Sequence, residues 1–165
     1  MSEPLHKKIF TPSEASDNIS YHITRLRVPL FEVDLGQAVY HGNYYHLFEL
    51  AREEMLRKTG FPYREFMNRQ LHLSVVEARC KYRKSLRYDD QIELHTAITS
   101  LRRRSLTFSQ LIYRPISTAR NDPSTPRGLE LCTECRMEMV CVQFGGRPTL
   151  LPEDFLQAVQ ALETR

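Results

Sequence analysis

Five stretches of the chain carry the alternation of apolar and polar residues that is typical of β-strands. The first begins near Tyr21, where Leu26, Val28 and Leu30 fall on one face and Arg25 and Arg27 fall on the other. In the fifth, Leu, Cys and Met residues share one parity, and Glu and Arg residues share the other. The pattern therefore predicts strands with one buried face. The four later stretches lie at about 71–83, 92–98, 106–112 and 131–141.

Irregular features interrupt these strands at three places. The apolar parity of the second stretch changes near Val75 and Val76, which predicts a β-bulge or a strong twist. A turn containing Arg102 to Arg104 separates the third stretch from the fourth. Residues 115–128, rich in Pro, Ser and Thr, separate the fourth from the fifth and are predicted to form a loop insertion.

A helix is predicted over about 44–58. Asn43 is a suitable N-cap, because its side-chain oxygen can accept a hydrogen bond from a free amide of the first turn. Gly60 and Pro62 supply a C-terminal stop, and Glu53 and Arg57 are spaced to form an exposed ion pair worth about 0.3 kcal/mol. The apolar stripe at helical spacing consists of Tyr44, Leu47, Phe48, Ala51 and Met55.

The order of these elements predicts one α+β domain over 21–165, in which an antiparallel sheet covers a central helix. A short amphipathic helix is expected from about Pro152, which stands at its start. Residues 1–20 lack sustained periodicity and are predicted to form a flexible N-terminal tail.

Composition narrows the class of protein. The chain has 165 residues, of which 41% are hydrophobic and 26% are charged, as in ordinary globular domains. Its longest apolar runs are too short to predict a membrane span, and its start lacks the apolar block of a signal peptide. Four cysteines are too few for a disulfide scaffold, so we expect reduced thiols and a cytoplasmic location.

The formal net charge of +3 conceals a local concentration of positive charge. Residues 79–104 hold eight Lys and Arg against three Asp and Glu, an excess of five positive charges. Such a stretch can attract nucleic acid, an anionic membrane or a phosphorylated small molecule, or it can simply be a solvated sheet face.

Two pairs of potential metal ligands are unfavourably spaced. Cys132 and Cys135 lie three residues apart on a predicted strand, so their side chains point to opposite faces. His41 and His46 would project about 140° apart on a helix. Neither pair predicts a metal site.

Asp34 and His41 form the most promising chemical constellation. Both precede the predicted helix, where free amides and the positive end of the dipole stabilise an anion. The amides could bind the oxygen of a tetrahedral intermediate while the carboxylate attacks or activates water. Spacing alone also allows that Asp34 caps a turn and that His41 packs in the loop.

The segment VDLGQAVYHGNYYHLFELAR, residues 33–52, resembles the 4-hydroxybenzoyl-CoA thioesterase branch of the hotdog-fold acyl-CoA thioesterases. It is most similar to the short bacterial enzymes of the Tol-Pal-linked subgroup. Asp34 matches the catalytic acid of the family motif, and the likeness extends over about residues 22–114. The residues that match the following H-x-N-Y and helix signatures are His41, Asn43, Tyr44, Glu49, Ala51 and Arg52.

This resemblance implies a hotdog fold, with a five-stranded antiparallel sheet wrapped around a central helix, and hydrolysis of an acyl-CoA thioester without metal or organic cofactor. Asp34 would be the general base or nucleophile, and the His41 amide would form the oxyanion hole with its imidazole as a helper. Tyr44 would bind substrate, and Arg102, Arg103 and Arg104 would bind the phosphates of CoA. Active sites would form between subunits of a dimer or a dimer of dimers, a homotetramer.

The chain departs from the family motif at three positions. Glu32 and Val33 replace the first two residues of an acid-Thr-acid trio, and Ser85 stands where many members have Pro. A non-catalytic hotdog protein that binds acyl-CoA or acyl carrier protein is the alternative. A hotdog dehydratase would need a differently spaced His and acid. A nucleic-acid partner is not expected, because the basic stretch lacks an aromatic platform beyond Tyr82 and Tyr88.

Overall fold

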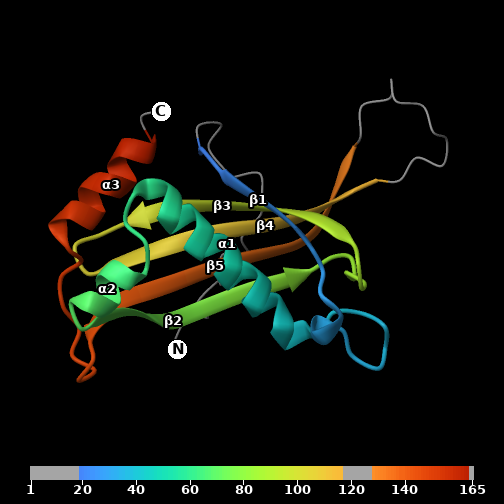
Figure 1. The fold of residues 1–165 in the computed structure, drawn as a ribbon, viewed down its shortest axis with the longest axis horizontal. Coiled ribbons are helices and arrows are strands. Elements are labelled where there is room, and N and C mark those ends of the chain that lie inside the picture. The colour runs from blue at the N-terminus through green and yellow to red at the C-terminus, as the bar shows by residue number, and fades with distance from the viewer. Residues whose placement is uncertain (1–18, 117–127, 164–165) are drawn as a thin grey trace, which may run out of the picture.

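The computed structural model describes residues 19–116 and 128–163. The predicted N-terminal tail and the predicted loop insertion lie almost wholly outside these residues. Within them, five strands form a single antiparallel sheet in the order β1-β3-β4-β5-β2, so β1 and β2 are its edges (Figure 1). The strands are β1 (His22–Arg27), β2 (Leu71–Tyr82), β3 (Gln91–Leu101), β4 (Ser105–Pro115) and β5 (Leu129–Gln143).

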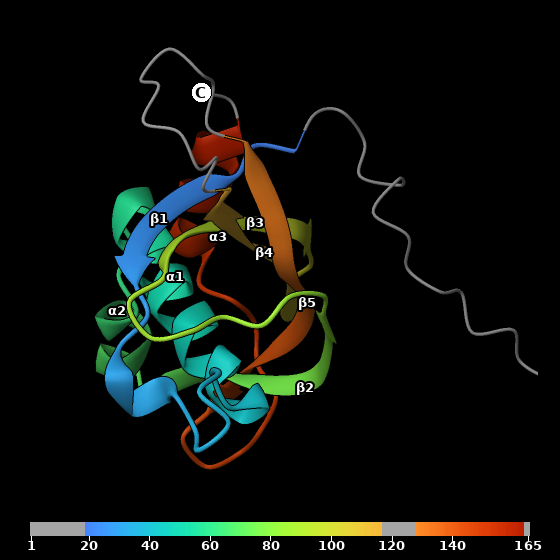
Figure 2. The ribbon, with the colours of Figure 1, turned by 90° about the vertical axis from the view of Figure 1, so that its right-hand side faces the viewer.

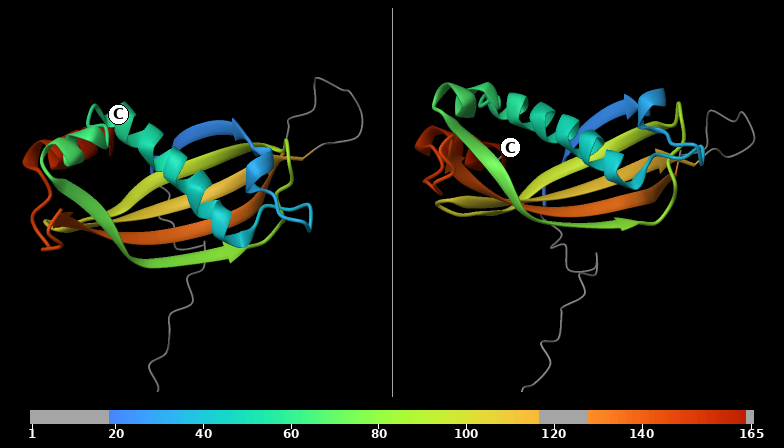
Figure 3. Two further views of the ribbon diagram at one scale, coloured as in Figure 1. Left: turned by 60° about the horizontal axis from the view of Figure 1, so that its bottom comes forward. Right: turned by 90° about the horizontal axis from the view of Figure 1, so that it is seen from below.

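The long helix α1 (Tyr44–Thr59) crosses one face of this sheet, which curves around it (Figure 3). The two elements bury a common core, because the apolar stripe of the helix faces the apolar parity of the strands. The predicted α+β arrangement of a sheet around a central helix is therefore confirmed. The core includes Leu47, Phe48, Ala51 and Met55 of α1 and Leu94, Phe108, Ile112 and Met137 of the sheet.

The predicted C-terminal stop of α1 is confirmed, and its predicted N-cap is not. At the C-terminus Gly60 takes the left-handed conformation, with φ of 83°, as the stop signal predicts. The predicted ion pair is also present, with 2.8 Å between Arg57 Nη2 and a Glu53 carboxylate oxygen. The predicted N-cap is wrong: Asn43 has helical backbone angles, and its side chain makes no capping hydrogen bond.

The first strand is shorter than the sequence pattern indicates. It ends at Arg27, and the chain then forms a 3₁₀ turn, η2 (Leu30–Glu32), in which Leu30 is exposed. The alternation thus continues into a segment that is not a strand. The predicted bulge is confirmed, because the register of β2 against β5 shifts between Val75 and Glu77.

Two short helices cover one end of the sheet (Figure 1). The predicted C-terminal helix is α3 (Glu153–Glu163), and α2 (Arg64–Asn68) has no counterpart in the sequence prediction. Phe61, Phe66 and Phe155 join α2, α3 and the C-terminal end of α1 through ring contacts of 5.0–5.3 Å. No helix in the described part of the chain is long and apolar enough to cross a membrane.

Candidate active site

A tight loop follows η2 and carries the acid that the sequence analysis identifies. Val33 pairs with Val39 in an isolated antiparallel bridge, and the Asp34 amide donates to the Ala38 carbonyl across 2.9 Å. Gln37 takes a left-handed conformation, with φ of 60°, within this turn. Asp34 is therefore held at the first position of a small hairpin. The loop formed by residues 33–39 lies close to the N-terminal end of α1 (Figure 2).

One oxygen of the Asp34 carboxylate is anchored by its own loop. The side chain is exposed, and Oδ1 accepts a hydrogen bond of 2.7 Å from the Gly36 amide. A Cβ atom at Gly36 would lie 2.9 Å from that oxygen, which is closer than real Cβ contacts. Glycine at position 36 therefore lets the carboxylate keep its place, and Oδ2 accepts no hydrogen bond from the described residues.

Glu32 fastens this loop to the helix. Its side chain is buried, and its two carboxylate oxygens lie 3.0 and 3.2 Å from Nδ1 of His46, in the first turn of α1. Its carbonyl oxygen accepts hydrogen bonds from the Tyr40 amide and from the Asn43 side chain, at 3.0 and 3.1 Å. Asn43 therefore connects the helix entry to the loop instead of capping the helix.

The entry to α1 is a single 3₁₀ turn, His41–Asn43. The Tyr82 hydroxyl, at the end of β2, donates to the carbonyl oxygen of His41 across 2.8 Å. This bond fixes the peptide that joins His41 to Gly42. Amides at the start of a helix lack intrahelical acceptors and can donate to an anion. The exposed imidazole of His41 packs against the Tyr40 ring, with 4.2 Å between centroids.

The connection between β2 and β3 crosses over this entry (Figure 2). Within it, the Leu86 amide donates to the Tyr44 hydroxyl at 3.2 Å, and the Leu86 carbonyl accepts from the Val39 amide at 2.8 Å. Leu86 itself is fully buried. One residue therefore holds both the first helical residue of α1 and the end of the Asp34 loop.

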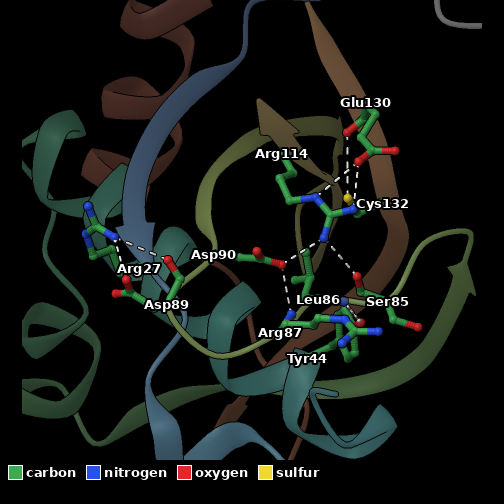
Figure 4. Close-up of polar contacts among 10 residues, drawn as sticks. All are labelled: Arg27, Tyr44, Ser85, Leu86, Arg87, Asp89, Asp90, Arg114, Glu130 and Cys132. Carbon is green, nitrogen blue, oxygen red and sulfur yellow. Dashed lines mark hydrogen bonds and ion pairs between the residues drawn. The ribbon is translucent and has the colours of Figure 1, made fainter. Parts of the chain in front are cut away.

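Arg114, on β4, secures that connection from its other side (Figure 4). Its guanidinium lies 2.8 Å from the Asp90 carboxylate and donates to the Ser85 carbonyl at 3.2 Å. A second edge of the guanidinium meets Glu130 of β5 at 2.6 Å. Contact with Glu130 and Asp90 raises the pKa of Arg114, so the guanidinium stays protonated.

Two phenols complete the packing beneath the site. Tyr44 is 3% exposed, and its ring meets that of Tyr82 edge to face, with centroids 5.0 Å apart. Burial raises the pKa of Tyr44 above its ordinary value, and burial together with contact with Cys80 raises that of Tyr82. Both hydroxyls are thus protonated at neutral pH, and Tyr82 can donate to His41.

The arrangement combines a fixed carboxylate with amide donors at the start of a helix. A carboxylate can attack a carbonyl carbon or remove a proton from water, and amide donors stabilise the oxyanion that forms. No group of three or more His, Cys, Asp or Glu side chains suited to a metal ion occurs among the described residues. An arrangement of this kind is suited to acyl transfer to water.

Comparison with known proteins identifies the family of the chain. Residues 28–159 match the sequence model of the thioesterase-like superfamily. The chain belongs to this thioesterase-like superfamily. The match includes the Asp34 loop, α1 and all of the sheet except β1.

Two proteins similar in sequence to this chain carry names that indicate an esterase or a thioester hydrolase. A putative esterase of Aquifex aeolicus is 40% identical over 92 residues, which cover 56% of this chain and 72% of that protein. The acyl-CoA thioester hydrolase YbgC of Escherichia coli O6:H1 is 36% identical over 97 residues, covering 59% of this chain and 72% of the relative.

A solved thioesterase structure shows the same architecture. The DHNA-CoA thioesterase of Staphylococcus aureus superposes with a TM-score of 0.76 at 23% identity, over 88% of this chain and 93% of that one. The hotdog fold implied by the sequence resemblance is thereby confirmed.

The structure brings some of the predicted site residues together and separates others. Asp34, His41 and Tyr44 lie at one end of the sheet, on the loop and the helix entry that Leu86 joins. No hydrogen bond between described residues links Asp34 to the imidazole of His41. The Tyr44 hydroxyl contacts Leu86, and its role in substrate binding stays a prediction.

The three predicted phosphate-binding arginines lie at the opposite end of the sheet. Arg102, Arg103 and Arg104 form the turn between β3 and β4, beside α3 (Figure 1). All three are exposed, and Arg102 and Arg103 line a depression of about 540 Å³ with Leu156 and Gln160 of α3. Within one chain they are therefore not neighbours of Asp34.

Sequence reasoning missed the roles of two residues that build the site. Glu32 looked like a departure from the family motif, yet its carboxylate holds His46. Tyr82 looked like one member of an alternating strand, yet its hydroxyl reaches His41. For Glu32, the signal in the sequence is a charged residue between two apolar residues, just before the Asp34 motif. That signal does not identify His46 as the residue that the carboxylate contacts.

Proposed function

We propose that this chain hydrolyses acyl-CoA thioesters to a free acid and CoA, with Asp34 as the reacting carboxylate. The observation that carries the proposal is that Asp34 is anchored on a loop that Glu32 and Leu86 clamp to the start of α1. The superfamily match and the acyl-CoA thioester hydrolase relatives support the reaction class.

Two routes follow from the exposed Asp34 carboxylate. As a general base it would take a proton from water while the hydroxide attacks the thioester carbonyl carbon. As a nucleophile it would form a mixed anhydride and expel the CoA thiolate, and water would then hydrolyse that anhydride. In both routes the amide at His41 would donate to the carbonyl oxygen as it becomes negative. Neither route requires a metal or an organic cofactor.

A groove beside α1 is the proposed place for the acyl group. It has a volume of about 410 Å³ and lies between α1, α2 and β2. Its wall includes the buried Arg52, whose guanidinium donates to the side chain of Gln110 across 2.9 Å. The remaining lining is mixed: Glu49, Glu53, Leu56, Tyr63, Met67, Leu73, Val75, Phe108 and Met139.

We propose that a second copy of the chain completes this groove. Among the described residues β2 pairs with β5 alone, so it is an edge strand of the sheet, and Val75 and Val76 are 51% and 59% exposed. An edge strand of 12 residues is suited to pairing with an identical strand. Antiparallel pairing of two copies would bring opposite ends of the two subunits closer together. In such a dimer, Arg102 to Arg104 of one copy would bind the phosphates of a CoA whose thioester lies at Asp34 of the other copy.

A thiol-release assay over a panel of aryl- and alkyl-CoA substrates tests the proposal in the purified, full-length protein. Asp34→Asn should reduce kcat by about 10²–10⁴-fold, the usual scale for a positioned general base. The matched control is Asp89→Asn, since Asp89 is an exposed acid of the β2–β3 connection. Turnover by folded Asp34→Asn at the wild-type rate would remove Asp34 from the mechanism. CoA binding without turnover over the whole panel would favour the non-catalytic alternative.

A further inference from the structure

Two cysteines lie directly opposite each other on neighbouring strands. In the antiparallel register of β2 and β5, Cys80 pairs with Cys135, and neither is in a disulfide. Residues in direct register point to the same face of a sheet. The next pair confirms this rule here, because Lys81 and Glu134 form an ion pair of 3.3 Å.

The backbone bonds show which kind of pair the cysteines form. The Arg83 amide donates to the Cys132 carbonyl at 2.8 Å, and these two residues follow the pair Tyr82–Thr133 in the register. Hydrogen-bonded and non-hydrogen-bonded pairs alternate along an antiparallel ladder. Three steps from Arg83, Cys80 and Cys135 are therefore a non-hydrogen-bonded pair, whose Cα atoms lie about 4.5 Å apart.

That separation falls at the short end of the range that a disulfide can bridge, about 4.4–6.8 Å. A bond could therefore form there without a large movement of the backbone. Exposed disulfides are among the readily reduced ones, and Cys80 is only half-buried, so the site suits reversible oxidation. Cys135 is 3% exposed, whereas Cys80 is half-buried and can be reached from solvent.

The two thiols also differ in reactivity. Their mutual contact lowers the pKa of Cys80 and raises that of Cys135. The thiolate is the reactive form of cysteine. Cys80 is thus suited to attack first and Cys135 to react second. By contrast, burial raises the pKa of both Cys132 and Cys141.

We propose that Cys80 and Cys135 form a thiol–disulfide exchange site for low-molecular-weight disulfides. The Cys80 thiolate attacks one sulfur of the small disulfide, forms a mixed disulfide and expels one small thiolate. Cys135 loses its proton and attacks the Cys80 sulfur, which forms the Cys80–Cys135 bond and expels the second small thiolate. Two protein thiols are oxidised and one small disulfide is reduced to two thiols.

Oxidation at this site would reach the candidate active site through Tyr82. Burial and Cys80 together raise the pKa of Tyr82, which lies two residues from Cys80 along the same face of β2, and the Tyr82 hydroxyl donates to the His41 carbonyl. A Cys80 sulfur drawn toward β5 would change the surroundings of the Tyr82 ring, which supports the helix entry. This consequence rests on the proposed function, whereas the exchange chemistry does not.

Incubation of the full-length protein with oxidised glutathione, followed by intact mass and peptide mapping, tests the exchange. We expect loss of two hydrogens and a Cys80–Cys135 crosslink that dithiothreitol reverses. Cys135→Ala should instead stop at one glutathione on Cys80, and Cys80→Ala should leave Cys135 unmodified. A crosslink through Cys132 or Cys141, or four thiols that all persist in the folded protein, would overturn the proposal.

Thiol-release activity measured on the same samples separates the two ideas. We expect an activity loss of about 3-fold or more on oxidation, fully restored by dithiothreitol and absent in Cys80→Ala, which oxidised glutathione leaves unmodified. A crosslink that forms without changing the rate would overturn the link through Tyr82 and leave the exchange site standing. A protein that forms the crosslink but has no activity even when reduced would count against the proposed function alone.

Discussion

The Tyr82 hydroxyl donates to the carbonyl oxygen of His41 across 2.8 Å, and this bond joins an edge strand of the sheet to the turn that starts α1. The two residues are 41 positions apart in the chain. Because a peptide is planar, holding the carbonyl of His41 also sets the direction of the amide that follows it. The geometry of the helix entry therefore depends on a side chain from the sheet.

Tyr82→Phe should reduce kcat by about 3- to 10-fold and leave KM nearly unchanged. A neutral hydrogen bond contributes about 0.5–1.5 kcal/mol, and here it holds the turn that carries the His41 amide, the proposed donor to the transition state. Steady-state thiol-release kinetics check this, with Tyr88→Phe as the control, since Tyr88 is 58% exposed in the β2–β3 connection. A change in KM alone would contradict the positioning role.

Gly36→Ala should reduce kcat by about 10-fold or more while the protein stays folded. The added methyl group would lie 2.9 Å from Oδ1 of Asp34 and would displace the carboxylate from its anchored position. Gly145→Ala is the matched control, because no atom lies within 4 Å of a Cβ at that position. Thermal melting should show that neither variant unfolds, and full activity of folded Gly36→Ala would show that the anchored geometry is dispensable.

Much of the fold follows from short-range pattern. The stripe from Tyr44 to Met55 predicted α1, and the parity change near Val75 predicted the bulge in β2. In these elements the buried face repeats with the period of the backbone, so the sequence alone records which side is inside. The first strand was predicted too long because Leu30 continues the alternation, although it is exposed in a 3₁₀ turn.

The site was less accessible to prediction because its contacts join distant parts of the chain. The position of Asp34 just before a helix was enough to predict it as a site residue. The contacts that hold its loop, however, come from Leu86 and from the side chain of Glu32. Cys132 and Cys135 drew attention as neighbours in sequence, whereas the partner of Cys135 is Cys80. Strand order and register decide these pairings, and neither is written in local periodicity.

Glu32→Gln should destabilise the protein by about 1–3 kcal/mol. The change replaces a buried carboxylate that contacts His46 with a neutral amide. The amide makes a weaker hydrogen bond with the imidazole, and its NH₂ group needs an acceptor in the same buried position. Urea denaturation followed by circular dichroism measures the free energy of unfolding. Glu54→Gln provides the comparison, because its ion pair with Arg57 is exposed and should contribute much less. Equal stability of the two variants would show that the buried pair does not fasten the loop.

The pair formed by Asp154 and Arg69 should make stability depend on acidic pH. Two hydrogen bonds of 2.6 and 2.7 Å to the Arg69 guanidinium hold the pKa of Asp154 below its ordinary value. A depressed pKa means that the unfolded chain binds the proton more readily. The stabilisation is therefore complete above the unfolded pKa of about 3.9 and is lost as the pH falls through the lower folded value.

Thermal melts of wild type and Asp154→Asn from pH 7 to pH 3 should show a Tm difference that is constant at the upper end and shrinks below about pH 4. The pair is exposed, so the difference should be small and should also decrease in high salt. A difference that grows toward low pH would contradict this assignment.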